Sequence, residues 1–174
     1  MFDFQKISSP ILFEGNEICA YRDPAVYYEN GRFYLFSTYT EITPRGVEMV
    51  TIESVSDDLI HWSEPVELTP RDPALNYSSP GNVIRNNGAY YLCLQTYCRE
   101  NGEKYGNARC RIFTMRSTDL IHWEAPVMLR VKGDVPEEEM GRMIDPYLVR
   151  DLKEPEKLPL FKTLTTMRLK KFAP

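Results

Sequence analysis

Apolar and polar residues alternate along much of this chain in short runs, and the runs come in two similar sets. Aromatic and β-branched residues alternate over Arg32–Thr40 and again over Ala89–Tyr97, and an Asn-Gly pair precedes each run, at 30–31 and 87–88. A period of two predicts half-buried strands, and Asn-Gly between two such strands predicts a two-residue hairpin turn. Because no stretch of useful length follows a helical period, the sequence predicts an all-β fold of antiparallel strands.

A thirteen-residue segment occurs twice, which indicates that the strands belong to a repeat. Ser56–Leu68 and Ser117–Leu129 are identical at nine positions, with a constant offset of 61 residues. A related opening precedes each copy, at Asp23–Phe36 and at Ser79–Leu92, and a third opening lies at Asp145–Asp151. Four strands in about sixty residues, repeated in tandem, are typical of the blades of a β-propeller.

The repeat predicts one incomplete propeller domain over residues 1–174, with about two and a half blades of four-stranded antiparallel sheet. Blade 1 is expected at about 17–70, blade 2 at about 75–131 and the start of blade 3 at about 140–151. The tail, 152–174, loses the pattern and has no clean strand alternation. We therefore expect the chain to be a truncated or frame-shifted form of a longer propeller.

Each copy of the repeat contains the sequence Asp-Leu-Ile-His-Trp. The histidines and tryptophans are His61, Trp62, His122 and Trp123. A catalytic residue has no reason to recur in every blade, so these four are predicted to be structural, with the tryptophans packing between blades. The four cysteines are Cys19, Cys93, Cys98 and Cys110, and their spacing fits no zinc site. They are predicted to be buried free thiols, and no metal or cofactor is expected.

The distribution of charge narrows the classes of partner. The chain has 21 Lys+Arg and 25 Asp+Glu; residues 1–156 hold all 25 acids and 16 of the basic residues, a balance of −9, whereas the tail from residue 157 carries +5. An acidic body argues against nucleic acid as the main partner, because phosphate binding needs clustered cations. The sequence shows no signal peptide and no apolar run long enough to span a membrane, so no membrane partner and a cytoplasmic location are expected.

The motifs together resemble a known family. The order Arg22-Asp23-Pro24-Ala25-Val26, then Ser56–Trp62, then Ile144-Asp145-Pro146 is similar to that of the five-bladed β-propeller glycosidases, above all family 43 of the glycoside hydrolases. That family comprises arabinanases, arabinofuranosidases and xylosidases. The resemblance covers roughly residues 17–151, and the fructosidase-like family 32 shares the turns. It implies a five-bladed propeller and inverting hydrolysis of plant-type glycans, with an oligosaccharide or polysaccharide as substrate.

The resemblance also implies roles for two carboxylates. Asp23 corresponds to the general base, and Asp145 to the carboxylate that orients the general acid and raises its pKa. Inverting hydrolysis needs a base that activates water and an acid that protonates the leaving oxygen. Both residues precede proline, which predicts extended backbone at the start of a strand. The alternative is that each aspartate merely caps a turn.

Four further residues are candidates for contact with substrate: Arg22, Tyr77, Asn82 and Arg142. Tyr77 could supply an aromatic face in place of a tryptophan that family 43 often has at the second blade, or could be an ordinary loop aromatic. Asn82 could hydrogen-bond a sugar hydroxyl. Arg142 could pair with Asp145 or lie on the surface.

One catalytic group is missing from the sequence. The general-acid Glu is expected about one blade past Asp145, near position 205, whereas the sequence has 174 residues. Whether the chain is an enzyme is therefore open, and three interpretations remain: a family 43-type glycosidase, a fructosidase-like retaining hydrolase, or a non-catalytic carbohydrate-binding or interaction module. An open propeller exposes apolar sheet faces, which predicts a homo-oligomer formed through these edges.

Overall fold

The computed structural model describes residues 4–7, 9, 11–130, 135–149 and 160–163, and this part of the chain is all-β apart from two single-turn 3-10 helices. The helices are η1 (Phe4–Lys6) and η2 (Glu137–Glu139). The predicted all-β class is confirmed. Within the described residues, no helix is long and apolar enough to cross a membrane.

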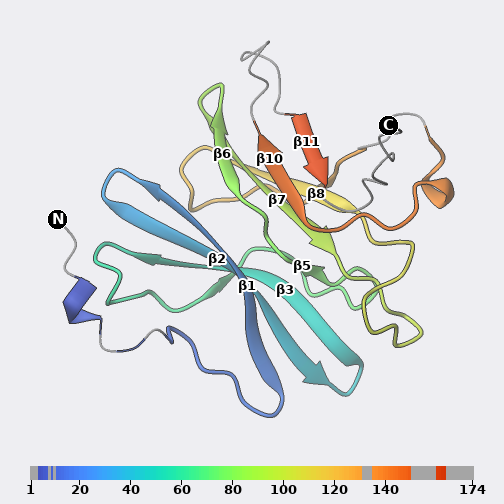
Figure 1. The fold of residues 1–174 in the computed structure, drawn as a ribbon, viewed down its shortest axis with the longest axis horizontal. Helices are drawn as coiled ribbons and strands as arrows, with labels where there is room; N and C mark the ends of the chain where they lie inside the picture. The colour runs from blue at the N-terminus through green and yellow to red at the C-terminus, as the bar shows by residue number, and fades with distance from the viewer. Residues whose placement is uncertain (1–3, 8, 10, 131–134, 150–159, 164–174) are drawn as a thin grey trace, which may run out of the picture.

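Blade 1 is a four-stranded antiparallel sheet in the order β1-β2-β3-β4 (Figure 1). Its strands are β1 (Cys19–Glu29), β2 (Arg32–Thr43), β3 (Gly46–Ser56) and β4 (Val66–Glu67). The predicted β1–β2 turn is confirmed: Asn30 and Gly31 have φ of 51° and 87°, which Asn and Gly adopt with the least strain. The outer strand is short, because only Val66–Glu67 pairs with β3.

Blade 2 repeats this sheet with an interrupted inner strand. Its strands are β5 (Tyr77–Ser78), β6 (Val83–Asn86), β7 (Ala89–Thr96), β8 (Ile112–Ser117) and β9 (Val127–Met128). Both β5 and β6 pair with β7, so together they correspond to β1, and the gap between them corresponds to a bulge in β1 between Arg22 and Ala25. The Asn87-Gly88 turn has positive φ at both residues, like its counterpart in blade 1.

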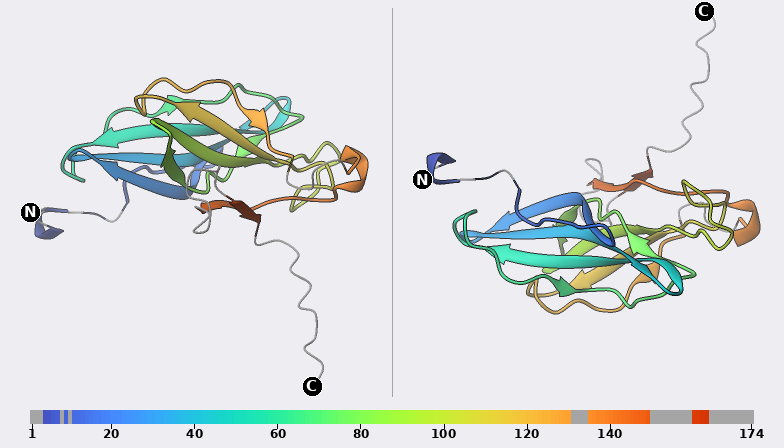
Figure 2. Two further views of the ribbon diagram at one scale, coloured as in Figure 1. Left: turned by 90° about the horizontal axis from the view of Figure 1, so that it is seen from above. Right: turned by 90° about the horizontal axis from the view of Figure 1, so that it is seen from below.

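Strand β10 (Pro146–Val149) lies in the segment where the start of blade 3 is predicted. It pairs antiparallel with β11 (Leu160–Thr163), so the tail supplies a strand that the sequence did not predict. The side views in Figure 2 show β10 and β11 on one side of the two larger sheets. Most of the basic tail, and the rest of the predicted blade 3, lie outside the described residues.

The main hydrophobic core lies between blades 1 and 2. Phe36 of β2 and Leu92, Leu94 and Met115 of blade 2 are almost fully buried in it. Trp123 packs against this core, with its ring 5.5 Å from that of Phe36 at an interplanar angle of 89°. The predicted packing between blades is therefore confirmed for Trp123. Trp62 instead borders a cavity of about 220 Å³ that Ile7, Ser9 and 11–13 of the N-terminal segment also line.

The two repeat segments fold into the same turn. In the second copy, Ser117 Oγ accepts the Leu120 N–H at 2.9 Å, and Asp119 Oδ1 accepts the N–H groups of Ile121 and His122 at 2.9 and 2.8 Å. The first copy has the same bonds within 0.1 Å. The imidazole and these backbone donors hold the pKa of Asp119 well below its usual range. The predicted structural role of both histidines agrees with these contacts.

The cysteines are all free, as predicted, and Cys93, Cys98 and Cys110 are buried whereas Cys19 is half-buried. On the opposite face of blade 1 from the core, Val26 and Tyr28 are 59% and 50% exposed. Such exposed apolar side chains are compatible with the expected open edge, and self-association stays a prediction.

Candidate functional site

The three blade openings share an unusual backbone conformation. Asp23, Ser79 and Asp145 each precede a proline and have φ of 53°, 45° and 55°. The predicted extended backbone is therefore wrong for both aspartates, and Asp23 lies in a bulge within β1 rather than at its start. Left-handed φ is uncommon for non-glycine residues, and such strain is frequent at functional sites.

The second and third openings are each held by a long strand of the blade before them. The Ser79 N–H donates to Thr38 Oγ1 on β2 at 2.7 Å, and the Asp145 N–H donates to Gln95 Oε1 on β7 at 2.6 Å. Thr38 and Gln95 occupy equivalent places in the two blades, and both are buried. These bonds offset the preference of the residue before proline for extended backbone. One blade therefore fixes the first residue of the next.

The same groups orient the carboxylate of Asp23. Thr38 Oγ1 and Ser79 Oγ both donate to Asp23 Oδ2, at 3.2 and 3.0 Å. Among the described residues, no hydrogen bond reaches Asp23 Oδ1, and the residue is half-buried. The carboxylate is thus fixed through one oxygen, while the other keeps its lone pairs for a ligand or a water molecule.

Asp23 and Asp145 line one cavity of about 270 Å³. Its other lining residues are Pro24, Ser79, Pro80, Gly81, Pro146 and Tyr147. The structure therefore brings together two predicted catalytic residues that are 122 positions apart in the sequence. They are also the only carboxylates among the described residues that line this cavity. Their catalytic roles stay predictions.

Gly81 allows blade 3 to approach this cavity. A Cβ atom on Gly81 would lie 1.9 Å from the Pro146 carbonyl oxygen and 2.7 Å from Cys93 Sγ. Real Cβ atoms never come so close to backbone, so only glycine fits between β7 and β10. Burial raises the pKa of the Cys93 thiol to about 11, which keeps it a neutral packing group.

Asn82 and Tyr77 do not line the cavity. Asn82 Oδ1 accepts the Leu148 N–H at 2.7 Å, and Asn82 Nδ2 donates to the Leu148 carbonyl at 3.0 Å. The side-chain amide thus makes the two hydrogen bonds to β10 that the backbone of a neighbouring strand would make. Tyr77 is buried in the core, with its ring 5.2 Å from that of Phe113. Both side chains are therefore engaged in contacts within the protein, and their contact with a substrate stays a prediction.

The two predicted arginines are exposed and lie outside the lining of this cavity. Within the described part of the chain, Arg22 makes no side-chain hydrogen bond, and Arg142 makes no ion pair with Asp145. The hydrogen bond from the Cys98 thiol is the main cause that lowers the pKa of Cys110, and the charge of Arg142 adds to it. Of the two alternatives for Arg142, the structure shows the surface position.

Sequence reasoning missed Thr38, Ser79, Gln95 and Tyr147. Tyr147 lines the cavity two residues after Asp145 and is 53% exposed, so it offers an aromatic face where Tyr77 does not. One signal could have found Ser79: it occupies the place of Asp23 in the aligned openings. Thr38 and Gln95 carry no such signal, because their hydrogen bonds cross from one blade to the next.

A reciprocal pair of substitutions tests the fixing of the openings. Gln95→Leu removes the acceptor for Asp145, so we expect the Asp145 amide to exchange with solvent about tenfold faster, with little change at Ser79. Thr38→Val is expected to do the reverse, since it removes the acceptor for Ser79. Hydrogen exchange followed by NMR measures both amides. Equal acceleration at both openings in either variant would contradict this arrangement.

The cavity has no metal-binding set. In the described ranges, no group of three or more His, Cys, Asp or Glu side chains could hold a metal ion. The arrangement offers a fixed carboxylate, a second exposed carboxylate and an aromatic ring around a small cavity that three prolines also line.

No family model matches the sequence. Solved structures do match the fold. A family 117 glycoside hydrolase from the marine bacterium Zobellia galactanivorans matches with a TM-score of 0.59 and 18% identity, over 80% of this chain and 48% of that one. Cellvibrio cellulosa alpha-L-arabinanase complexed with arabinohexaose matches with a TM-score of 0.50 and 20% identity, over 75% and 41%. Bombyx mori family 32 beta-fructofuranosidase matches with 0.50 and 17%, over 78% and 28%.

These likenesses show the fold. The chain has the architecture of the five-bladed β-propeller glycoside hydrolases, as predicted, and it spans less than half the length of each of these relatives. Family 43 is one of several families that share this fold.

Proposed function

We propose that the cavity between the blade openings is the catalytic centre of a family 43-type glycoside hydrolase that cleaves arabinose- or xylose-containing glycans with inversion. The observation that carries the proposal is the meeting of Asp23 and Asp145 in one cavity. The similarity in fold to an arabinanase that binds arabinohexaose supports the choice of glycan.

Asp23 is the general base in this proposal. Two hydroxyl donors hold its Oδ2, which leaves Oδ1 to take a proton from the attacking water. Asp145 is exposed, and its negative charge would raise the pKa of a neighbouring acid by like-charge repulsion. The ring of Tyr147 provides an apolar face against which a sugar ring can lie.

The proton for the leaving oxygen needs a third carboxyl group. Since Asp23 and Asp145 are the only carboxylates of the described lining, this acid has to come from outside the described residues. If none reaches the cavity, the site binds glycan without cleaving it. This second candidate, a carbohydrate-binding module, rests on the same lining.

Hydrolysis of 4-nitrophenyl arabinofuranoside and xyloside by the full chain tests the proposal. We expect turnover that Asp23→Asn lowers by about 10²–10⁴-fold, because the substitution removes the base. Asp72→Asn is the matched control: Arg71-Asp72-Pro73 repeats the Arg22-Asp23-Pro24 tripeptide, but Asp72 Oδ1 accepts the N–H of Ala74 in a turn. The control should keep wild-type turnover.

Two further readouts separate the alternatives. NMR of the first product gives its anomer: inversion supports the family 43-type mechanism, whereas retention favours the fructosidase-like one. Absence of turnover together with calorimetric binding of arabinohexaose, lost in Asp23→Asn, would assign the cavity to a binding module. Absence of both turnover and binding would overturn the proposal.

A further inference from the structure

A cavity of about 520 Å³ lies at a place that the proposed reaction does not use. Three segments form it: the β2–β3 turn at Arg45–Val47, the segment at Pro73–Asn76, and the loop that follows β7 at Arg99–Gly102. A volume of this size is typical of small-molecule sites. Arg45, Arg99 and Glu100 line the cavity. The kind of ligand that it can bind depends on which of these charges already have a partner within the protein.

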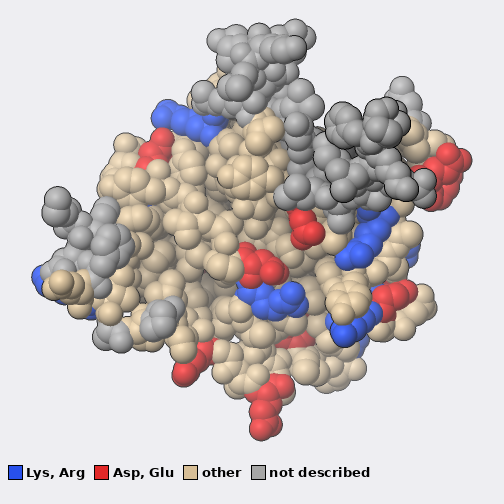
Figure 3. Space-filling model, viewed as in Figure 1, with Lys and Arg blue, Asp and Glu red and all other residues tan. Residues whose placement is uncertain are grey.

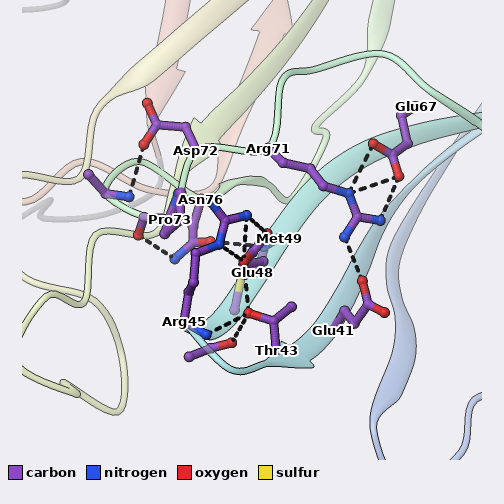
Figure 4. Close-up of polar contacts among 12 residues, drawn as sticks. Glu41, Thr43, Arg45, Glu48, Met49, Glu67, Arg71, Asp72, Pro73 and Asn76 are labelled. Atoms are coloured by element: carbon purple, nitrogen blue, oxygen red, sulfur yellow. Dashed lines mark hydrogen bonds and ion pairs between the residues drawn. The ribbon is translucent and has the colours of Figure 1, made fainter.

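Arg45 is held by a buried carboxylate. Its Nε and Nη2 donate to the two oxygens of Glu48 at 2.9 and 3.0 Å, and Thr43 Oγ1 donates to the same carboxylate at 2.8 Å (Figure 4). The Glu48 side chain is only 2% exposed, and the Thr43 hydroxyl, then Arg45, keep its pKa low. The guanidinium plane is therefore fixed, and Arg45 Nη1 has no partner among the described residues.

The wall behind Arg45 is also rigid. Asn76 Oδ1 accepts the Met49 N–H at 2.8 Å, and Asn76 Nδ2 donates to the Pro73 carbonyl at 3.1 Å. Figure 4 shows Asn76 and Pro73 beside the Arg45 guanidinium. Both the oxygen and the nitrogen of the Asn76 amide thus have partners within the protein. Asn76 therefore bounds the cavity, and we assign the binding of a ligand to the arginines.

Arg99 provides the uncompensated charge. The Glu100 carboxylate is already neutralised, since it accepts from Asn107 at 2.6 Å and pairs with Arg109. In the described ranges, no carboxylate pairs with Arg99, which is half-buried. On the face shown in Figure 3, acidic and basic side chains are interspersed, and neither sign forms a large patch. An arginine fork suits a carboxylate, which it can bind through two parallel hydrogen bonds.

We propose that Arg45 and Arg99 bind the carboxylate of an acidic sugar residue in a glycan. The inference rests on the proposed glycan-binding function, and it adds a substrate class, a uronic acid-containing chain. The cavity and Asp23 lie along one strand: Thr38 touches Asp23 and Thr43 supports Glu48. Five residues of antiparallel strand span roughly 17 Å, so a single sugar residue does not reach from one site to the other.

Calorimetry with trigalacturonate and neutral galactotriose tests the proposal on the full chain. We expect trigalacturonate to bind at least tenfold more tightly than galactotriose at low salt. Arg99→Ala should remove this preference, and Arg99→Lys should restore only part of it, because lysine keeps the charge but not the fork. Arg32→Ala is the control, since Arg32 pairs with Asp57 and lies outside this cavity. Circular dichroism confirms that each variant folds.

The outcomes separate this inference from the proposed function. Equal binding of the two oligosaccharides by wild type, or unchanged trigalacturonate binding by Arg99→Ala, overturns the carboxylate site. Tighter binding of a sulfated galactotriose than of trigalacturonate also overturns it, in favour of a sulfate ester. Arabinohexaose binding that depends on Asp23 reports on the proposed function alone, so either result can fail while the other holds.

Discussion

Glu53→Gln is expected to stabilise the chain above pH 8 by roughly 3–5 kcal/mol relative to wild type, and to leave its stability near pH 4.5 almost unchanged. Glu53 lies on β3 opposite Phe36 and is only 6% exposed. Burial raises its pKa from 4.5 to about 8, the charge of Asp119 adds to the rise, and the Trp123 indole partly offsets it. Its Oε1 has no hydrogen-bond partner among the described residues.

The direction follows from the two pKa values. The unfolded chain releases the Glu53 proton near pH 4.5, whereas the folded chain keeps it until about pH 8. The stability contributed by the protonated carboxyl is complete below pH 4.5 and is lost as the pH rises to about 8. Glutamine has the same shape and no charge, so the variant avoids this loss.

Urea unfolding at a series of pH values from 4.5 to 9 measures the difference. The two curves of unfolding free energy against pH should coincide at the acid end and diverge by pH 8. Comparing the variant with wild type cancels contributions that both share, such as that of the Cys98–Cys110 pair. Parallel curves over the whole range would show that Glu53 keeps an ordinary pKa in the folded chain.

Trp123→Ala is expected to cost about 3 kcal/mol of unfolding free energy, and Trp62→Ala about 1 kcal/mol. The two tryptophans are matched by sequence, since each ends the same Asp-Leu-Ile-His-Trp segment. They differ in what they touch: Trp123 packs on Phe36 and the inter-blade core, whereas Trp62 borders the N-terminal segment.

Urea unfolding at pH 5, followed by far-ultraviolet circular dichroism, compares the two variants without relying on tryptophan fluorescence. At pH 8.5 the cost of Trp123→Ala should be smaller than at pH 5, because the substitution lets water reach Glu53. If Trp123→Ala and Trp62→Ala lower the unfolding free energy equally, the contact of Trp123 between the blades adds no stability beyond local packing.

Much of the fold could be predicted because its signals are local. Asn30-Gly31 and Asn87-Gly88 mark their turns through residues that adopt positive φ, and alternation marks β2 and β7. The positive φ of Leu59 and Leu120, 66° and 65°, was not predictable from their type. It follows from the side chains of Ser56 and Asp58, and of their counterparts, which bind the backbone on both sides of the leucine.

The site was predictable only in part. The repeat marked Asp23 and Asp145 as openings of different blades, and a propeller brings such openings together. Their backbone conformation was predicted wrongly, because the rule for residues before proline is local whereas Thr38 and Gln95 act from neighbouring blades. The contact that Asn82 makes was equally unpredictable, since its partner, Leu148, lies 66 residues away. β11 was missed because the sequence of the tail does not alternate.

The hydrogen bonds of Thr38 and Gln95 each join a strand of one blade to the opening of the next blade along the chain. Thr38 of blade 1 fixes the backbone at the opening of blade 2, and Gln95 of blade 2 fixes the backbone at the opening of blade 3. A change in one blade is therefore expected to affect the opening of the blade that follows it. Damage to β7 would release Asp145 while the Thr38 contact with Asp23 stays intact. Damage to β2 would disturb Ser79 and Asp23 together. Of the two carboxylates, Asp145 can therefore be set free on its own by a change in the blade that precedes it.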